Sequence, residues 1–415
     1  MSYFTYSNNA LIAEEVEIKK IVESKKTPFF CYSSRAIKEN YNNFKDCFSE
    51  INAKICFSLK SNSNLSIVNI LSKLGAGADV VSEGEFKKAL KAKINPENII
   101  FSGIGKTEEE IALAINNKCS QINIESSSEL NTVNKIAEKL GIKQNIAIRI
   151  NPDVNANTHD KITTGTLENK FGIPTNETFD IFCNHEKYKS LNLNGIAFHI
   201  GSNINELSPF EKTFKISADL IKDLKSKNIK IENIDVGGGI GIEDQTFKYS
   251  DYKELLKKYF DLSNQKIILE PGRSICANAA ILVSKILYIK RNNRKKFIII
   301  DAGMNDMMRT ALYDSEHKIL PLIKKEEQEE ISTEIVGPIC ETADKFLSTN
   351  KYNDVRENDY VAILNAGAYG SSMSSNYNSR PLLEEVMIEG KNTITIRKRQ
   401  AFDDMIKDEI LIDNI

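Results

Sequence analysis

The chain has 415 residues, of which 41% are hydrophobic and 27% charged, and its formal net charge is −2. This near-neutral balance gives no basic surface of the kind that binds nucleic acid or anionic lipid, so we expect neither partner. Because the length exceeds the roughly 250 residues of a single (β/α)8 barrel, the chain has room for more than one domain.

The cysteines and the amino terminus indicate the cellular compartment. Seven cysteines are scattered without CxxC spacing, which favours reduced thiols in a cytoplasm. Residues 1–20 include acidic side chains and no apolar core, so they do not predict a signal peptide. The longest apolar stretch, residues 279–289, is interrupted by Lys285 and is too short to span a bilayer. We therefore expect a cytoplasmic protein with no membrane partner.

Eight short apolar runs rich in β-branched residues recur between residues 54 and 272 and alternate with segments of helical periodicity. This alternation predicts eight strand–helix units, which is the period of a (β/α)8 barrel of the TIM type. The active site of such a barrel lies at the carboxyl ends of its strands. The runs are KICFSLK (54–60), GADVVS (77–82), IIFSG (99–103), INIES (122–126), IAIRI (146–150), GIAFHIG (195–201), NIDVGGG (233–239) and KIILEPG (266–272).

The pattern changes after Glu270, because the helical spacers disappear from Ala277 onward. Strand-like runs then follow one another, which is typical of an antiparallel β domain. We expect an α/β protein with a barrel at residues 29–277 and a mostly antiparallel, sandwich- or barrel-like domain formed by residues 1–28 and 278–415. The runs of the second domain are ILVSKILYIK, KKFIIIDAG, EEISTEIVG, DYVAILNAG, EEVMIEG and NTITIRK.

Lys60 ends the first barrel run. A lysine at the end of a buried strand is partly desolvated, which lowers its pKa and frees the amine to form an imine with an aldehyde. The alternative is a lysine whose charged end reaches solvent.

Three other strand ends carry groups that could complete a site. His199 is followed by Gly201 and Ser202, although a lone histidine is more often a packed core residue. The glycine run 237–241 could hold a phosphate with its backbone amides, or could form a tight turn. Glu270 needs a cationic or protonated partner, which is either Arg273 or a protonated pyridine nitrogen.

An amine for an aldehyde, a phosphate cradle, an imidazole and a buried carboxylate together describe a pyridoxal phosphate site. From about Phe29 onward the chain resembles the fold-type III pyridoxal phosphate-dependent decarboxylases, and within them the group that acts on diaminopimelate. The resemblance implies decarboxylation of meso-2,6-diaminopimelate to L-lysine and carbon dioxide, the last step of lysine biosynthesis. Its motifs are FSLKSN, GADVVSEGE, KFGIP, FHIGSN, GGGIG, EPGR, MNDMMRTALY, GPICETADKF and GAYGSSMSSNYNSRP.

The resemblance implies roles for the residues around the cofactor. Lys60 would hold pyridoxal 5'-phosphate covalently, His199 would stack on its ring, and Glu270 would pair with the ring nitrogen. Arg273 would lie near both phosphate and substrate. The remaining cofactor-binding residues implied are Asp79, Ser202, Gly239 and Gly272.

The resemblance also implies substrate-binding residues in the second domain. Arg309 and Tyr313 would contact the distal carboxylate of the substrate, and Glu341 its distal amino group. Tyr369 would lie against cofactor and substrate. Cys340 would reach across the interface of a homodimer with shared active sites and supply a proton; its alternative is a buried packing residue.

Several alternatives remain open at this stage. One is a related decarboxylase of ornithine, lysine or carboxynorspermidine; in the ornithine decarboxylases Asp typically takes the place of Glu341. Others are an alanine racemase, which needs a second base such as Tyr313 or Tyr369, and a carrier of pyridoxal phosphate without catalytic activity. The chain departs from the family pattern at Thr310, where proline is usual; the change puts the local rigidity near Tyr313 in doubt.

Overall fold

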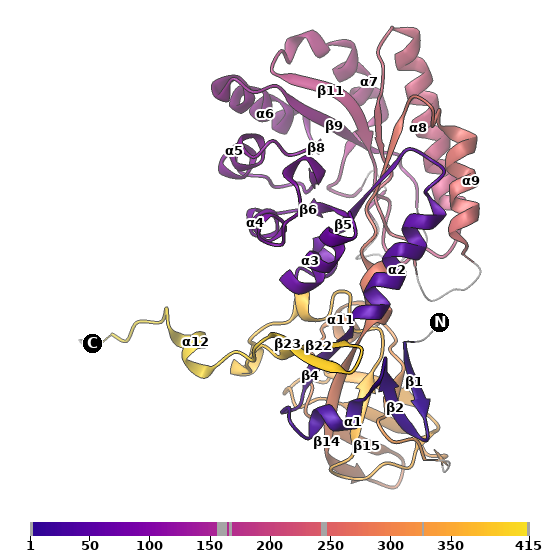
Figure 1. Ribbon diagram of the computed structural model, residues 1–415, viewed down its shortest axis with the longest axis vertical. Coiled ribbons are helices and arrows are strands. Elements are labelled where there is room, and N and C mark those ends of the chain that lie inside the picture. The colour runs from indigo at the N-terminus through magenta and orange to yellow at the C-terminus, as the bar shows by residue number, and fades with distance from the viewer. Residues whose placement is uncertain (1–2, 156–163, 166–167, 242–246, 326–327, 413–415) are drawn as a thin grey trace. The chain divides into compact units, whose positions relative to one another are not determined.

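The computed structural model describes residues 3–155, 164–165, 168–241, 247–325 and 328–412 (Figure 1). Internal contacts divide the chain into two compact units: a barrel unit, residues 38–274, and a β unit, residues 1–37 with 275–415. Within the ranges just given, no helix has both the length and the apolar character needed to cross a membrane.

The barrel unit contains a closed ring of parallel strands. Each strand pairs with the next one in this series, and the last strand, β13, pairs back with the first, β5. All eight runs expected from the sequence form these strands, so the predicted barrel is confirmed. The strands are β5 (Ala53–Ser58), β6 (Gly77–Val80), β7 (Ile99–Phe101), β8 (Gln121–Ile124), β9 (Gln144–Asn151), β11 (Leu191–Ala197), β12 (Asn233–Asp235) and β13 (Lys266–Leu269). A short strand, β10 (Ile173–Pro174), pairs with β9 outside the ring.

Polar caps start several helices of the barrel unit soon after the preceding strand. The side chains of Ser82, Thr107 and Ser126 each accept a hydrogen bond from a backbone N–H in the first turn of their helix. The helices are α2 (Ser34–Cys47), α3 (Leu65–Lys73), α4 (Glu83–Lys91), α5 (Glu108–Asn116), α6 (Ser127–Leu140), α7 (Thr175–Cys183), α8 (Ser208–Ser226) and α9 (Tyr249–Tyr259).

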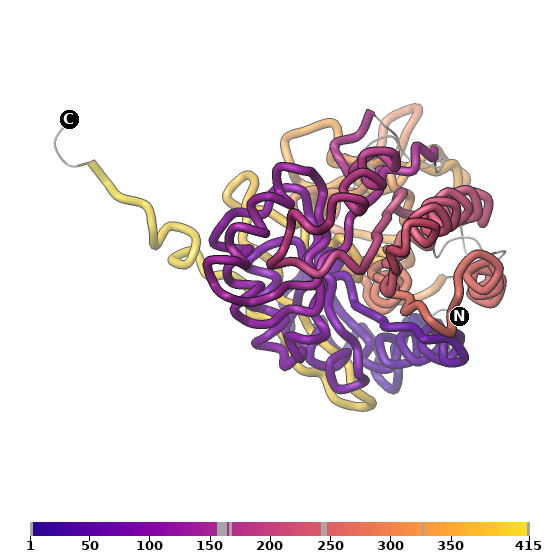
Figure 2. The backbone as a smooth tube through the Cα atoms, turned by 90° about the horizontal axis from the view of Figure 1, so that it is seen from above, coloured from indigo at the N-terminus to yellow at the C-terminus, as the bar shows by residue number. Residues whose placement is uncertain are grey.

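Helices α8 and α9 lie side by side in both views (Figures 1 and 2). Tyr252 of α9 meets Phe210 and Phe214 of α8 edge-on, with ring centroids 5.0 and 5.5 Å away. Such edge-to-face pairs stabilise the packing beyond the apolar area that they bury. The aromatic cluster therefore fixes this pair of helices, which come just before β12 and β13.

The β unit is built around the long strand β14 (Ala280–Arg291). Its first half pairs antiparallel with β4 (Phe29–Ser33) and β21 (Tyr360–Ile363), and its second half with β15 (Lys296–Ile300). The six runs expected in this part of the chain all form strands. The other strands of the unit are β1 (Phe4–Ser7), β2 (Ala10–Ala13), β3 (Val16–Glu17), β16 (Ile319–Pro321), β17 (Gln328–Glu329), β18 (Thr333–Val336), β19 (Lys345–Thr349), β20 (Tyr352–Asn353), β22 (Glu384–Glu389) and β23 (Asn392–Arg397).

The division of the chain differs from the boundaries expected at residues 29 and 277. Residues 29–33 form β4, which pairs with β14 and with β22 of the β unit. Every residue of β4 is buried, so its sequence has the continuous apolar character of a barrel strand. Periodicity alone cannot distinguish these two settings.

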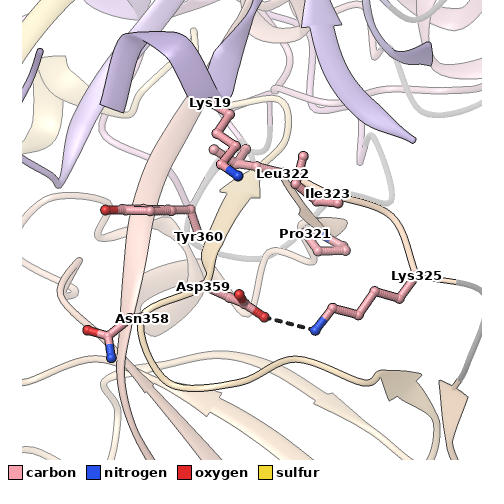
Figure 3. Close-up of a pocket in the computed structure, with 8 residues that line it drawn as sticks. All are labelled: Lys19, Pro321, Leu322, Ile323, Lys325, Asn358, Asp359 and Tyr360. Atoms are coloured by element: carbon pink, nitrogen blue, oxygen red, sulfur yellow. Dashed lines mark hydrogen bonds and ion pairs between the residues drawn. The ribbon is translucent and has the colours of Figure 1, made fainter. Parts of the chain in front are cut away.

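The β unit also contains a small cavity of about 130 Å³ (Figure 3). Two of its lining residues, Lys325 and Asp359, form an ion pair of 3.2 Å. Its lining residues include none of the functional residues expected from the sequence. The lining consists of Lys19, Pro321, Leu322, Ile323, Lys325, Asn358, Asp359 and Tyr360.

Candidate active site

Lys60 lies in a single 3₁₀ turn, η1 (Leu59–Ser61), directly after strand β5. Its Nζ is 3.6 Å from Oδ2 of Asp79, a fully buried carboxylate, while the lysine side chain itself is 36% exposed. Ser58 Oγ donates a hydrogen bond of 2.7 Å to the same carboxylate oxygen. The amine is therefore directed by a buried counter-charge and stays accessible, as a lysine that reacts with an aldehyde requires.

The residues expected to bind a phosphate lie at the ends of the later barrel strands. Arg273 donates from Nη2 to Oγ of Ser202 over 3.2 Å. Gly239 has a φ of +93°, and a Cβ there would lie 2.2 Å from a backbone carbonyl oxygen, so no side chain fits. A Cβ at Gly272 would lie 2.9 Å from a serine hydroxyl oxygen. A guanidinium, a hydroxyl and side-chain-free backbone suit a phosphate group.

His199 follows strand β11 in the barrel unit. Its Nδ1 accepts a hydrogen bond of 3.3 Å from the backbone N–H of Gly238, and its backbone oxygen accepts one of 2.6 Å from Thr164 Oγ1. Burial and the nearby charges of Lys60 and Arg149 hold the pKa of His199 well below 6.5. The ring is therefore neutral at physiological pH, which suits stacking on an aromatic cofactor.

The low pKa of His199 makes stability depend on pH. Below about pH 6.5 the unfolded chain protonates this histidine and the folded chain does not, so acid removes stability. We expect His199→Asn to lose less stability than the wild type between about pH 7 and pH 5, by up to about 1.4 kcal/mol per pH unit. Denaturant unfolding at a series of pH values measures this difference; identical pH slopes would contradict it.

Glu270 follows strand β13 and is 7% exposed. Burial raises the pKa of Glu270 well above 4.5, and the neighbouring carboxylates of Asp235 and Asp79 raise it further. Ser102 Oγ donates to Oε1 of Glu270 over 3.4 Å. The barrel therefore favours the protonated form of Glu270, at the place where the sequence predicts a partner for a ring nitrogen.

In the β unit, Cys340 and Glu341 lie on an exposed loop after strand β18. Asp344 fastens this loop, because its carboxylate accepts hydrogen bonds from the backbone N–H of Ile339 and of Met304, at 2.6 and 2.7 Å. Cys340 is exposed in this chain, whereas the alternative role considered for it was that of a buried packing residue. The thiol and the carboxylate are thus displayed on a loop that is held at its base.

Arg309 begins the short helix α11 (Arg309–Tyr313) and is 5% exposed. It donates to Nε2 of His317 over 3.1 Å and to Ser315 Oγ over 3.2 Å. Thr310, which stands where proline was expected, is the second residue of this helix and is buried. A first-turn position accepts either residue, so the helix forms with threonine as well.

Tyr369 has a φ of +56°, which a residue with a side chain rarely adopts. It lies between Gly367 and Gly370, and a Cβ at Gly367 would lie 1.8 Å from the carbonyl oxygen of Cys276. The tight turn needs glycine at that position, which explains the GAYG motif.

Sequence reasoning missed several polar residues at the site. Asn123 and Asp235 lie on barrel strands and Ser102 follows one, all inside the apolar runs that were interpreted only as strands. Glu85, in the first turn of α4, accepts a hydrogen bond of 3.0 Å from the backbone N–H of Val81. Burial raises the pKa of Glu85 to about 7. A polar residue inside an apolar run was the available signal for the first three.

These features place the barrel among enzymes that hold pyridoxal phosphate. Residues 34–277 match the family model of the pyridoxal binding domain of pyridoxal-dependent decarboxylases, which confirms the cofactor expected from the sequence. The chain is 41% identical over 409 residues to the diaminopimelate decarboxylase of Aquifex aeolicus, covering 98% of this chain and 97% of that one.

Two solved structures are similar over nearly the whole chain. Diaminopimelate decarboxylase from Helicobacter pylori complexed with L-lysine has a TM-score of 0.90 and 41% identity, covering 94% of this chain and 98% of that one. The enzyme from M. jannaschii in co-complex with L-lysine has a TM-score of 0.93 and 35% identity, covering 99% and 98%. The chain belongs to the diaminopimelate decarboxylase family.

Proposed function

We propose that the protein decarboxylates meso-2,6-diaminopimelate to L-lysine and carbon dioxide with pyridoxal phosphate, the last step of lysine biosynthesis. The observation that carries this proposal is the 41% identity over 98% of the chain, because it extends over the β unit as well as the barrel. The L-lysine bound in two related structures is the product of the proposed reaction.

When bound, pyridoxal phosphate supplies an electron sink that accepts the electron pair left by carbon dioxide. Lys60 holds the cofactor and Asp79 keeps the amine directed toward it, while Arg273 and Ser202 bind the phosphate. Glu270 holds or releases a proton at the ring nitrogen, which sets the strength of the sink. Cys340 donates the proton that replaces the carboxyl group at the reacting carbon.

Substrate selection is assigned to residues of the β unit. Arg309 and Tyr313 bind the distal carboxylate, for which a guanidinium provides paired donors. Glu341 binds the distal ammonium group of the substrate. Tyr377 donates a hydrogen bond to the carboxylate of Glu341. Tyr369 lies against the cofactor and the substrate.

Loss of the Arg309 charge is expected to weaken substrate binding more than turnover. We expect Arg309→Gln to raise KM for diaminopimelate about 10- to 100-fold, since a hydrogen bond to a charged group contributes about 1.5–3 kcal/mol. Steady-state kinetics of the variant measure this, with the exposed Arg356→Gln as the matched control. An unchanged KM with a lower kcat would contradict the assignment.

We further propose a homodimer in which Cys340 serves the active site of the partner. Mixing Lys60→Ala chains with Cys340→Ala chains should then restore about a quarter of wild-type activity, because half of the randomly formed dimers contain one intact site. Size-exclusion chromatography checks that the mixed dimers form, and each variant alone provides the background. Mixed dimers with no activity above that background would count against shared sites.

The alternatives have less support. A lysine decarboxylase from Selenomonas ruminantium is 21% identical with a TM-score of 0.80, a likeness that shows the fold alone. A racemase or a carrier would have no use for residues that bind a distal carboxylate and ammonium group. We also propose a cytoplasmic location without nucleic-acid or membrane partners, in line with the near-neutral charge and the free cysteines of the described chain.

A genetic experiment tests the proposed activity. The protein should restore growth without added lysine to a bacterium that lacks its own diaminopimelate decarboxylase. The Lys60→Ala variant, expressed at the same level, should not. Failure of the soluble wild-type protein to restore growth would overturn the proposed substrate.

A further inference from the structure

A chain of polar side chains crosses the inside of the barrel beneath Glu270. Gln121 Nε2 donates to Oδ1 of Asn123 over 2.8 Å. Asn123 Nδ2 donates to Oδ2 of Asp235 over 2.9 Å and to Ser102 Oγ over 3.1 Å. Ser102 in turn donates to Glu270 over 3.4 Å. All the hydrogen bonds therefore run in one direction, toward two carboxyl groups.

The two carboxyl groups at the end of this chain have unequal numbers of donors. Asp235, which is 1% exposed, accepts from Asn123 and also from the backbone N–H of Gly237, over 3.0 Å. Glu270 accepts the longer bond from Ser102. The side chains of Asp235 and Glu270 are also close enough for each to influence the pKa of the other. Two adjacent buried carboxyl groups cannot both ionise cheaply, so we expect one of them to keep a proton. The two donors to Asp235 favour the charge on Asp235 and the proton on Glu270.

The surrounding ionisable groups do not reverse this arrangement. Asp79 on β6 and Lys60 on η1 pair with each other at 3.6 Å, so their charges largely offset. Cys56 on β5 interacts with both carboxyl groups and Tyr252 on α9 with Asp235. Burial raises the pKa of both Cys56 and Tyr252, so both are neutral at pH 7. The charge of Lys60 lowers the pKa of Glu270, but burial and the neighbouring carboxylates of Asp235 and Asp79 raise it.

We propose that Asp235 is a positioning residue that accepts the hydrogen bond of the Glu270 carboxyl group and keeps a proton there for the ring nitrogen of the cofactor. The inference rests on the role proposed for Glu270 above. With the cofactor bound, the Glu270 carboxyl oxygen would hold this proton toward the ring nitrogen and could release it there. Glu270 would then remain as the carboxylate that balances the charge, and no other bond would change.

Infrared titration of the full chain without added cofactor tests the proton on Glu270. The Glu270→Gln variant identifies the carboxyl absorption of Glu270 by difference. We expect this absorption to persist to a pH well above the usual range of a glutamate, and Asp235→Asn to lower its midpoint by about one pH unit or more. An unchanged midpoint in a folded Asp235→Asn protein would overturn the proposal.

A second pair of variants separates the hydrogen-bond chain from general damage to the barrel. Asn123→Ala removes a donor from Asp235, and the Glu270 absorption at pH 7 should weaken as the proton moves toward Asp235. Asn194→Ala is the matched control, because Asn194 is also a buried amide on a barrel strand and donates to Glu232 over 3.0 Å. Equal effects of the two variants would overturn the role of Asn123 and Asp235.

Addition of pyridoxal phosphate distinguishes this inference from the proposed function. Binding should remove the Glu270 carboxyl absorption in the wild type, because the proton then lies on the ring nitrogen. If Asp235→Asn shifts the midpoint but the cofactor leaves the absorption intact, delivery of the proton is overturned while the carboxyl pair stands. Neither infrared result depends on turnover of diaminopimelate, so failure of the proposed substrate is detected separately.

Discussion

Replacement of Lys60 by alanine is expected to lower the rate of carbon dioxide release by at least about 10³-fold, because the variant lacks the amine that holds the cofactor. The near-ultraviolet and visible absorbance of the cofactor bound to lysine should disappear together with the activity. Lys54→Ala is the matched control. Lys54 lies on the same strand, β5, and donates instead to the backbone carbonyl oxygen of Glu97 and to Ser120 Oγ, over 2.7 and 2.9 Å.

The two readouts make this prediction specific. A Lys60→Ala protein that still shows the lysine-bound absorbance would mean that another lysine holds the cofactor. Lys106 is the informative comparison within the barrel, since its Nζ is buried and engaged by Glu129 at 2.7 Å and by two backbone carbonyl oxygens. An amine that is already so fully engaged is a poor candidate for reaction with an aldehyde.

Substitution of Glu270 by glutamine is expected to lower kcat about 10²- to 10⁴-fold while leaving the cofactor attached to Lys60. Glutamine retains the shape of the side chain but can neither lose a proton nor carry the charge that stabilises a protonated ring nitrogen. Absorbance spectra give the cofactor content, and single-turnover measurements give the rate of the chemical step. The exposed Glu232→Gln, before strand β12, controls for loss of a carboxylate elsewhere in the barrel unit.

A Glu270→Gln protein with full cofactor content and wild-type kcat would contradict this assignment. Loss of the cofactor together with activity would instead indicate that Glu270 contributes mainly to binding. The distinction matters because burial raises the pKa of this side chain and so favours its protonated form.

The barrel could be predicted from the sequence because strands and helices differ in period. Each apolar run of the barrel was too short for a helix, and helical segments with polar first-turn residues separated the runs. The ends of these runs also revealed Lys60, His199 and Glu270, since strand ends gather at one edge of a barrel. Their roles in binding the cofactor stay predictions.

The polar chain from Gln121 to Glu270 could not be predicted in the same way. Asn123 and Asp235 point inward from strands whose period-2 pattern is hidden, because residues on both faces of a parallel sheet are buried. Closure of the barrel brings together residues that are far apart in the sequence, such as Asn123 and Asp235, which are 112 positions apart. The partner of each polar residue therefore does not follow from the local sequence. The place of strand β4 in the β unit could not be predicted for a related reason, because a continuously buried run does not indicate which sheet it joins.

The most direct measurement of the central proposal is carbon dioxide release from the purified protein with pyridoxal phosphate, comparing meso-diaminopimelate, ornithine and lysine as substrates. We expect release with meso-diaminopimelate alone, together with an equal amount of L-lysine. Release from ornithine or lysine instead would contradict the proposed substrate and the role of Glu341. No release from any of the three would contradict the proposed decarboxylase activity.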